Sequence, residues 1–201
     1  MASVAISPKE VSELRARTGA GMMDCKRALE EAGGDREKAA EILRKKGITK
    51  AEKRAGRTAS QGTVVSYIHH NGQVGVLVEL NSETDFVART DAFQQLARDI
   101  ALHVASADPI GVSAADVPAD LIERERRIAE EQVIAEGKPE AVRAKIVEGK
   151  VKKFIAERTL LEQPYVRDDK KTVGDLVKEI SGTLGEAVTV RRFARFQVGA
   201  A

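Results

Sequence analysis

Three short segments contain residues of the types that bind ligands or carry out reactions. "TGAGMMDCK" (18–26) contains glycines, as phosphate-binding loops do, and the only cysteine, Cys25. His69 and His70 supply two adjacent imidazoles, the commonest metal ligands. "NSETDFVART" (81–90) places a carboxylate beside one of only five phenylalanines, in a stretch that is otherwise mostly polar. Phosphate binding and metal binding each also require these residues to stand at a particular spacing in the sequence.

The glycine-bearing segment lacks the spacing of a phosphate loop. The motif G-x-x-x-x-G-K-[ST] would need a glycine where Asp24 stands, and no strand pattern precedes the segment. Cys25 lies on an apolar helical stripe with Ala28 and Leu29, which favours a buried, inert thiol over a nucleophile. We therefore expect no direct nucleotide binding and no cofactor.

The histidines do not form a predicted metal site. His69 and His70 are consecutive in a predicted strand, so their side chains are expected on opposite faces. His103 adds no third ligand at a recognisable spacing, and one cysteine excludes a cysteine-cluster site. No nucleophile with a neighbouring base emerges either, so the sequence predicts a protein that is not an enzyme.

The position of Phe86 beside Asp85, in what looks like a turn, allows two interpretations. Apolar rings are usually buried, which favours Phe86 as an anchor between the loop and the core. Alternatively, small polar neighbours present the ring outward, where a pocket of a partner protein can desolvate it. These residues alone do not decide between the two.

Charge is nearly balanced in total but uneven along the chain. The 33 basic and 31 acidic residues exclude a strongly basic nucleic-acid-binding protein on net charge. Seven basic residues and one glutamate lie in "RKKGITKAEKRAGR" (44–57), which either contacts RNA or an acidic protein surface or is a solvated linker helix. The start, "MASVAISPKE", lacks a secretion signal, and no apolar stretch approaches the ~18 residues of a membrane span. These features indicate a cytoplasmic protein.

The first ~46 residues have the pattern of three short helices. Ser7-Pro8-Lys9-Glu10 combines an N-cap serine, a proline at the first helical position and a glutamate at the third. Gly33-Gly34 ends the second helix, Asp35 caps the third, and Gly47 is expected to end it. The predicted domains are a three-helix, partner-binding module with its basic linker at 1–55 and an α+β core at 56–201.

The predicted core begins with a β-hairpin. Strands at 63–70 and 73–80 flank Asn71-Gly72, a type I′ turn that pairs His69 with Val74 and places Tyr67 on the core face. The remaining elements follow from helical periodicity, from Gly and Pro breaks and, at the end, from strand-like alternation. They are a helix at 93–104, a protruding helical hairpin at about 118–158, a helix at 173–184 and a third antiparallel strand at 187–198.

Two stretches together resemble a known family. "ELRARTGAGMMDCKRALEEAGGD" (13–35), followed by the hairpin and "TDFV" (84–87), resembles bacterial translation elongation factor Ts, the guanine-nucleotide exchange factor of elongation factor Tu. The similarity extends through 136–154, 161–166 and 191–199, so it covers essentially the whole chain. The resemblance implies a ubiquitin-associated-like fold for the three-helix module, with an antiparallel core and a helical hairpin after it.

The resemblance also implies positions that contact the partner. Arg15, Met22, Met23 and Lys26 match positions that meet its GTPase domain. Within Thr84-Asp85-Phe86-Val87, the Asp-Phe pair matches residues that enter between helices of that domain and disturb its magnesium site. Adjacent methionines at a helix start cannot both face the bundle core, so one is expected to be exposed.

Two further contacts are implied less completely. A histidine on the hairpin matches one of them, and either His69 or His70 fits it. Val166 matches another, whereas Arg167 stands where other members have an apolar residue. The implied protein binds elongation factor Tu, GDP-bound or nucleotide-free, and needs no catalytic group or metal of its own, nor a membrane or specific nucleic acid.

The resemblance also implies a homodimer, because longer members look as if they carry two related core units and this chain has one. The interface is expected to use the sheet and its terminal strand. Two other functions stay open. An RNA-binding translation accessory would use 44–57, although aromatic stacking residues are missing there. An adaptor for ubiquitin-like surfaces would use the three-helix module but leaves 84–87 unexplained.

Overall fold

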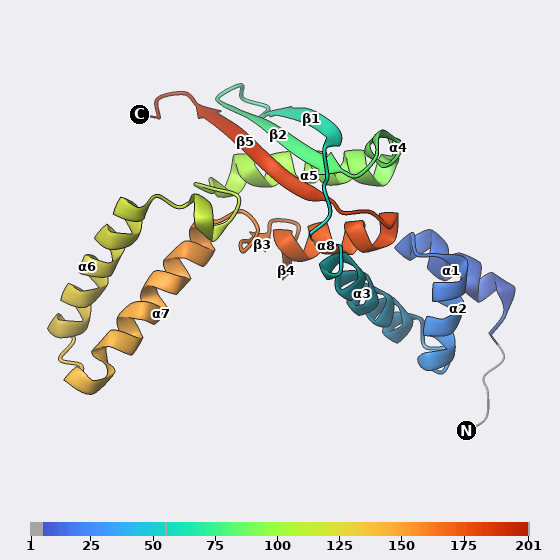
Figure 1. Ribbon diagram of the computed structural model, residues 1–201, viewed down its shortest axis with the longest axis horizontal. Helices are drawn as coiled ribbons and strands as arrows, with labels where there is room; N and C mark the ends of the chain where they lie inside the picture. Colours follow the sequence, from blue (N-terminus) through green and yellow to red (C-terminus); the bar gives the residue numbers. More distant parts are fainter. Residues whose placement is uncertain (1–5, 55, 201) are drawn as a thin grey trace. The chain divides into compact units, whose positions relative to one another are not determined.

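The computed structural model describes residues 6–54 and 56–200 and confirms the predicted α+β class (Figure 1). The helices are α1 (Pro8–Thr18), α2 (Met22–Glu31), α3 (Arg36–Glu52), α4 (Asp85–Ala88), α5 (Asp91–Ala107), α6 (Ala119–Ala135), α7 (Glu140–Arg158) and α8 (Val173–Leu184). The strands are β1 (Gln61–Ile68), β2 (Val74–Ser82), β3 (Pro164–Tyr165), β4 (Asp168–Thr172) and β5 (Thr189–Gln197). The predicted domain boundary at residue 55 falls outside the described residues.

The chain forms two compact units, and each is built from segments that are far apart in the sequence. The first unit comprises Met1–Thr63, Asn81–Leu96 and Asp175–Thr189. The second comprises Val64–Leu80, Ala97–Gly174 and Val190–Ala201. The division at residue 55 that we predict from the sequence stays a prediction.

The first unit contains the predicted three-helix bundle. Ser7 and Glu10 form the expected capping box of α1, and Gly19 ends that helix with φ +67°. Asp35 caps α3 by accepting hydrogen bonds from two backbone N–H groups. The bundle core consists of apolar side chains from all three helices, namely Val11, Leu14, Cys25, Ala28, Leu29, Ala39 and Leu43. Cys25 is fully buried there, as its place on the stripe predicts.

The third helix is longer than predicted, because α3 continues through Gly47 to Glu52. Gly47 lies where α3 meets α8, and a Cβ added to Gly182 of α8 would come 2.4 Å from the Gly47 carbonyl oxygen. The absence of a side chain therefore serves the close approach of two backbones. A glycine inside a helix and one at its end look alike in a sequence, which is why the prediction is wrong.

The second unit contains most of a three-stranded sheet with the order β1-β2-β5, so the predicted third strand is confirmed. Val76 and Val78 of β2 point to the same face and are buried, as the alternation predicts. Figure 1 shows α5 along one face of the sheet. Arg195 of β5 contacts the end of this helix, since its guanidinium donates to the Ala105 carbonyl at 3.3 Å.

The connection between β1 and β2 differs from the predicted two-residue turn. The His69 N–H donates to the Val74 carbonyl at 2.8 Å, which confirms that pair. The Gly72 N–H, however, donates to His69 at 2.7 Å, so His70 and Asn71 are the central residues of the turn. Gly72 alone has positive φ among the described loop residues, whereas a type I′ turn needs two such residues. The Asn71 side chain accepts from the Gln73 N–H at 3.1 Å and stabilises the longer loop.

The charged helices α6 and α7 form the predicted helical hairpin, also within the second unit (Figure 1). Gly137 turns the chain between them with φ +66°. A narrow apolar seam of Ala129, Val133, Val147 and Val151 holds the two helices together. None of the helices in the described ranges is both long and apolar enough to span a membrane.

The short sheet of β3 and β4 was not predicted. Pro164 pairs with Thr172 and Tyr165 with Asp168. β4 has the sequence DDKKT and β3 has only two residues, so neither shows the apolar alternation by which strands are recognised. The sheet matters here because Val166 follows β3 directly.

Candidate partner-binding surface

The segment around Phe86 is a single helical turn, α4, with Thr84 as its N-cap. The Val87 N–H donates to the Thr84 hydroxyl at 3.3 Å. Val87 and Ala88 are buried, whereas the Phe86 side chain is 77% exposed. The interpretation of Phe86 as a core anchor is therefore wrong, because the two residues that follow it, Val87 and Ala88, anchor the turn instead.

Asp85 lies on the same turn and is also accessible. Its Oδ2 accepts from the Arg89 guanidinium at 2.7 Å, and the two side chains are 63% and 80% exposed. An ion pair at this exposure is worth little and exchanges readily with solvent or with other charges. Asp85 can therefore be released from Arg89 at small cost when another group approaches.

The three-helix bundle exposes every side chain that the family resemblance singled out on it. Arg15 lies on the outer face of α1, and Lys26 lies near Glu30 on α2 with 3.9 Å between charged atoms. Met22 and Met23 are 46% and 63% exposed. One exposed methionine was expected and two are found, because the buried stripe of α2 begins only at Cys25, in the following turn.

The positions on the bundle and on α4 belong to the same compact unit, although the sequence analysis assigned them to different domains. His69, His70 and Val166 belong to the other unit. Exposed apolar side chains flanked by charged ones are typical of surfaces that bind proteins.

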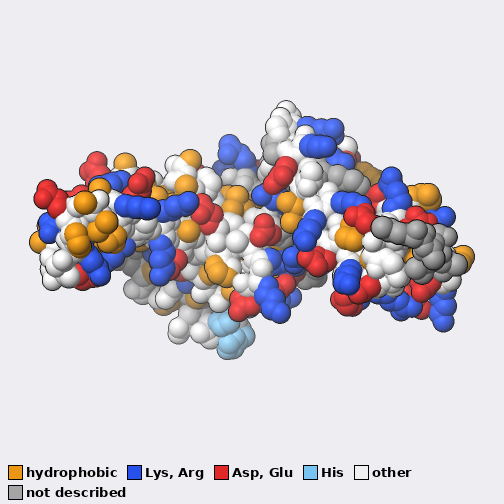
Figure 2. Space-filling view, turned by 90° about the horizontal axis from the view of Figure 1, so that it is seen from below, with side chains coloured by type: hydrophobic (Ala, Val, Ile, Leu, Met, Phe, Trp, Pro, Cys, Tyr) orange, Lys and Arg blue, Asp and Glu red, His pale blue; other side chains and the backbone are white. Residues whose placement is uncertain are grey.

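The two histidines of the hairpin lie together, and the prediction that they face opposite ways is wrong. Their ring centroids are 4.2 Å apart, and the pale blue patch in Figure 2 shows histidine side chains gathered on this face of the molecule. The strand ends at Ile68, so the alternation of a strand does not apply to His69 and His70. Nδ1 of His69 is also 3.0 Å from the Tyr67 hydroxyl. The described residues contain no group of three or more His, Cys, Asp or Glu that could hold a metal ion.

Val166 is 44% exposed, and buried polar groups beneath it hold its backbone. The Val166 N–H donates to Nδ1 of His103 at 3.3 Å. Nε2 of His103 donates in turn to Oε1 of Gln163 at 3.0 Å. Arg167, the residue that departs from the family pattern, pairs with Asp99 of α5 at 2.9 Å. The sequence analysis did not predict these hydrogen bonds or this ion pair. A polar residue, His103, within an apolar helical repeat could have indicated a buried hydrogen bond there.

Burial lowers the pKa of His103 below its ordinary value of 6.5, and the weaker opposing effect is the hydrogen bond to Gln163. The neutral imidazole is therefore favoured in the folded protein. The hydrogen bond from the Val166 N–H also requires the neutral form, since Nδ1 can accept it only while unprotonated. Neutral His103 contributes to the free energy of unfolding, and this contribution is fully present above about pH 6.5. It is lost as the pH falls below that value, because the unfolded chain then binds the proton more readily than the folded one.

We expect the free energy of unfolding to fall between pH 7.5 and pH 5, and to fall less steeply in a His103→Gln variant. Urea unfolding at several pH values measures both slopes. His103→Gln lowers stability at pH 7.5 as well, so the comparison concerns the slopes and not the absolute values. Equal slopes would contradict the assignment of this pH dependence to His103.

At least three of the seven basic residues of the segment 44–57 lie near acidic side chains. Lys45 lies 2.8 Å from Glu41, Lys46 contacts Glu31, and Arg57 lies 3.5 Å from Glu83. Pairs between exposed side chains are weak and exchange readily with solvent. Lys45 and Lys46, paired on the surface of α3, have the pattern of a solvated helix face.

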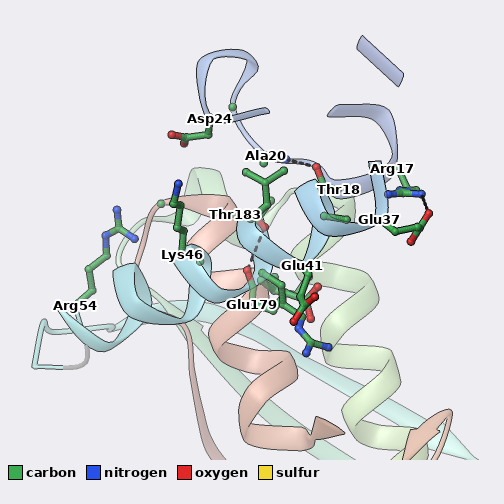
Figure 3. Close-up of a pocket in the computed structure, with 18 residues that line it drawn as sticks. Arg17, Thr18, Ala20, Asp24, Glu37, Glu41, Lys46, Arg54, Glu179 and Thr183 are labelled. Atoms are coloured by element: carbon green, nitrogen blue, oxygen red, sulfur yellow. Dashed lines mark hydrogen bonds and ion pairs between the residues drawn. The ribbon is translucent and has the colours of Figure 1, made fainter. Parts of the chain in front are cut away.

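A cavity of about 790 Å³ lies within the first unit, between the bundle and α8 (Figure 3). Charged side chains of both signs line it, and Arg17 is already paired with Glu37. None of the positions implied by the resemblance is among its lining residues. The cavity therefore does not form part of the candidate surface.

The chain is similar to known proteins over nearly its whole length. The sequence model of the family described as "Elongation factor TS" matches residues 9–200. Elongation factor Ts of Solidesulfovibrio magneticus is 53% identical over 195 residues, which are 97% of this chain and 98% of the relative. Those of Syntrophomonas wolfei and Fervidobacterium nodosum are 55% and 53% identical over 194 residues, 96% of this chain and 91% and 98% of their own lengths. The chain belongs to the elongation factor Ts family.

Proposed function

We propose that this protein is a guanine-nucleotide exchange factor, which binds elongation factor Tu with GDP and promotes GDP release during translation elongation. The observation that carries the proposal is Phe86, a large ring that is 77% exposed on a turn anchored by the buried Val87 and Ala88. Membership of the elongation factor Ts family supports the choice of partner. The same membership supports a cytoplasmic location.

In the proposed mechanism, Phe86 enters between helices of the GTPase domain of the partner and Asp85 leaves its pair with Arg89. The Asp85 carboxylate then brings negative charge toward the magnesium and phosphate site of the partner. Thr84 and Val87 hold the turn that carries both residues. No catalytic group of this chain takes part, because the exchange factor only has to bind the nucleotide-free form more tightly than the GDP form.

The remaining exposed positions are proposed to supply affinity. Arg15, Met22, Met23 and Lys26 of the module at 1–55 would cover one patch of the GTPase domain, and flexible thioethers suit such a patch. His69 or His70, together with Val166, would contact the partner from the second unit. The absence of aromatic residues from 44–57 favours this function over an RNA-binding accessory, and the exposed Phe86 favours it over a general ubiquitin-like adaptor.

The proposal is tested by the release of fluorescently labelled GDP from elongation factor Tu. Adding this protein should accelerate release in proportion to its concentration until the partner is saturated. A matched chain with Met22→Ala and Met23→Ala should need more protein to reach saturation and still approach the same limiting rate. A release rate that does not change at any concentration of the wild-type protein would refute the exchange function.

We also propose that the protein is a homodimer that associates through the outer face of its sheet. A shallow groove there is lined by exposed apolar side chains from all three strands and from the residue after β5, namely Ile68, Leu77, Phe196 and Val198. Phe196 and Val198 are 69% and 72% exposed, and exposed apolar patches of this kind mark association sites. A second copy can cover the patch with its own equivalent, as a two-fold interface requires.

A further inference from the structure

The turn that carries Phe86 is tied to the end of α8 by two carboxylates. Oε2 of Glu186 accepts from the Thr84 N–H at 3.0 Å, and Oε1 accepts from the Thr84 hydroxyl at 2.7 Å. In the opposite direction, Oε1 of Glu83 accepts from the Ala187 N–H at 2.7 Å. Each segment thus binds the backbone of the other, and all of these residues lie in the first unit.

Glu186 also determines how Thr84 caps the turn. Because the Thr84 hydroxyl donates its only hydrogen to Glu186, its oxygen is left to accept from the Val87 N–H. Without Glu186 the hydroxyl could rotate and donate elsewhere. A helix of a single turn has little stability of its own, so α4 depends on such external contacts for its direction.

Glu186 is itself held on a rigid base. Gly185 turns the chain after α8 with φ +80°, and the Gly185 N–H donates to the Ser181 carbonyl at 3.0 Å. The Ser181 hydroxyl donates to the Glu186 carbonyl oxygen at 2.5 Å. The Glu186 side chain therefore extends from a backbone position that hydrogen bonds to α8 hold in place. Through Glu186, α8 restricts the motion of the turn at Thr84.

We propose that Glu186 is a positioning residue for Phe86, which sets the direction in which the ring leaves the surface and reduces its motion before the partner arrives. This inference rests on the proposed exchange function for its consequence, because the fixed direction matters when Phe86 enters the GTPase domain. Ordering the ring beforehand removes an entropic cost of binding. Glu186 does not have to touch the partner in order to act.

The first test needs no partner. The chain contains no tryptophan, so Phe86→Trp introduces a single indole whose fluorescence anisotropy reports motion of the α4 side chain. Adding Glu186→Ala to that variant should lower the anisotropy, whereas adding Glu136→Ala should not, since Glu136 lies at the end of α6 in the other unit. An unchanged anisotropy in the Glu186→Ala chain would overturn the inference, whatever the protein does to GDP.

The second test is a double-mutant cycle in the GDP-release assay. Glu186→Ala alone should lower the exchange rate about tenfold, which is of the order expected for the cost of immobilising one side chain on binding. In a Phe86→Ala background the same substitution should change the rate less than about twofold, because the ring that it positions is gone. An equal loss in both backgrounds would overturn the inference, since Glu186 would then act independently of Phe86.

The two failures are distinguishable. If the wild-type protein does not accelerate GDP release, the proposed function fails, and the anisotropy still decides whether Glu186 orders the turn. If the wild-type protein is active and the cycle shows no coupling, only the positioning role fails. Melting temperatures of all variants, measured by circular dichroism, exclude loss of folding as the cause.

Discussion

Phe86→Ala is expected to reduce GDP release from elongation factor Tu and the affinity for its nucleotide-free form, while leaving the stability of this protein nearly unchanged. Aromatic residues at the centre of an interface are typically worth about 2–4 kcal/mol, which corresponds to roughly a 30- to 1000-fold loss of affinity. The ring is 77% exposed in the free protein, so its removal leaves no cavity in the core. Titration with nucleotide-free partner and the GDP-release assay measure the two losses.

Phe93→Ala is the matched control for this prediction. Phe93 has 0% exposure and lies on α5, only seven positions further along the chain. Its removal should lower the free energy of unfolding by about 3–5 kcal/mol, as large-to-small substitutions in cores do. A Phe86→Ala protein that exchanges GDP normally, or that fails only because it unfolds as the Phe93→Ala protein does, would contradict the interfacial role of Phe86.

Binding linkage adds a requirement to the same experiment. Whatever factor this protein removes from the affinity of the partner for GDP, GDP must remove from the affinity for this protein. If Asp85 acts near the magnesium site, Asp85→Ala should reduce that factor even where binding to the nucleotide-free partner persists. Titrations with and without GDP determine the factor for each variant.

The second large effect is expected from Phe196→Asp, which should convert the proposed dimer into a monomer. The substitution would bury one unpaired carboxylate from each copy in an apolar interface. An unpaired charge in such a place typically costs about 2–5 kcal/mol, which raises the dissociation constant roughly 30- to 5000-fold. Sedimentation equilibrium at tens of micromolar protein measures the mass of both forms.

Ile134→Asp provides the matched control, since Ile134 is 59% exposed on α6 and lies outside the sheet. It adds the same charge and should leave the mass of the dimer unchanged. The association should also be indifferent to reductant, because the only cysteine, Cys25, is buried in the bundle of the first unit. A wild-type protein that sediments only as a monomer would rule out the dimer.

The elements with strong local signals were predictable from the sequence. The capping box at Ser7, the apolar stripe of α5, the break between α6 and α7 and the alternation of β2 each lie within a few neighbouring residues. Local hydrogen bonding and side-chain periodicity are properties of the chain itself, and the α+β class follows from their order. The family resemblance also implied the partner-binding positions from the sequence. It did not indicate which residues surround them in the folded protein.

The sequence did not reveal features that depend on distant segments. Gly47 resembled a helix end, whereas the close approach of Gly182 accounts for a glycine within α3. The turn at His70 and Asn71 was misjudged for a local reason, because the Asn71 side chain accepts from the Gln73 N–H and so favours a different turn. The first error thus reflects a contact between distant segments, and the second reflects competition between two local hydrogen-bond patterns.

The sequence by itself determined that a phenylalanine and a carboxylate stand side by side between β2 and α5, in a chain with few aromatic residues. Whether that ring faces the core or the solvent was decided by tertiary structure alone. Val87 and Ala88 fill the space beneath the turn, and Glu186, about a hundred residues away, holds Thr84 above it. Burial is a property of how distant segments meet, so local sequence could state both possibilities for Phe86 and could not choose between them.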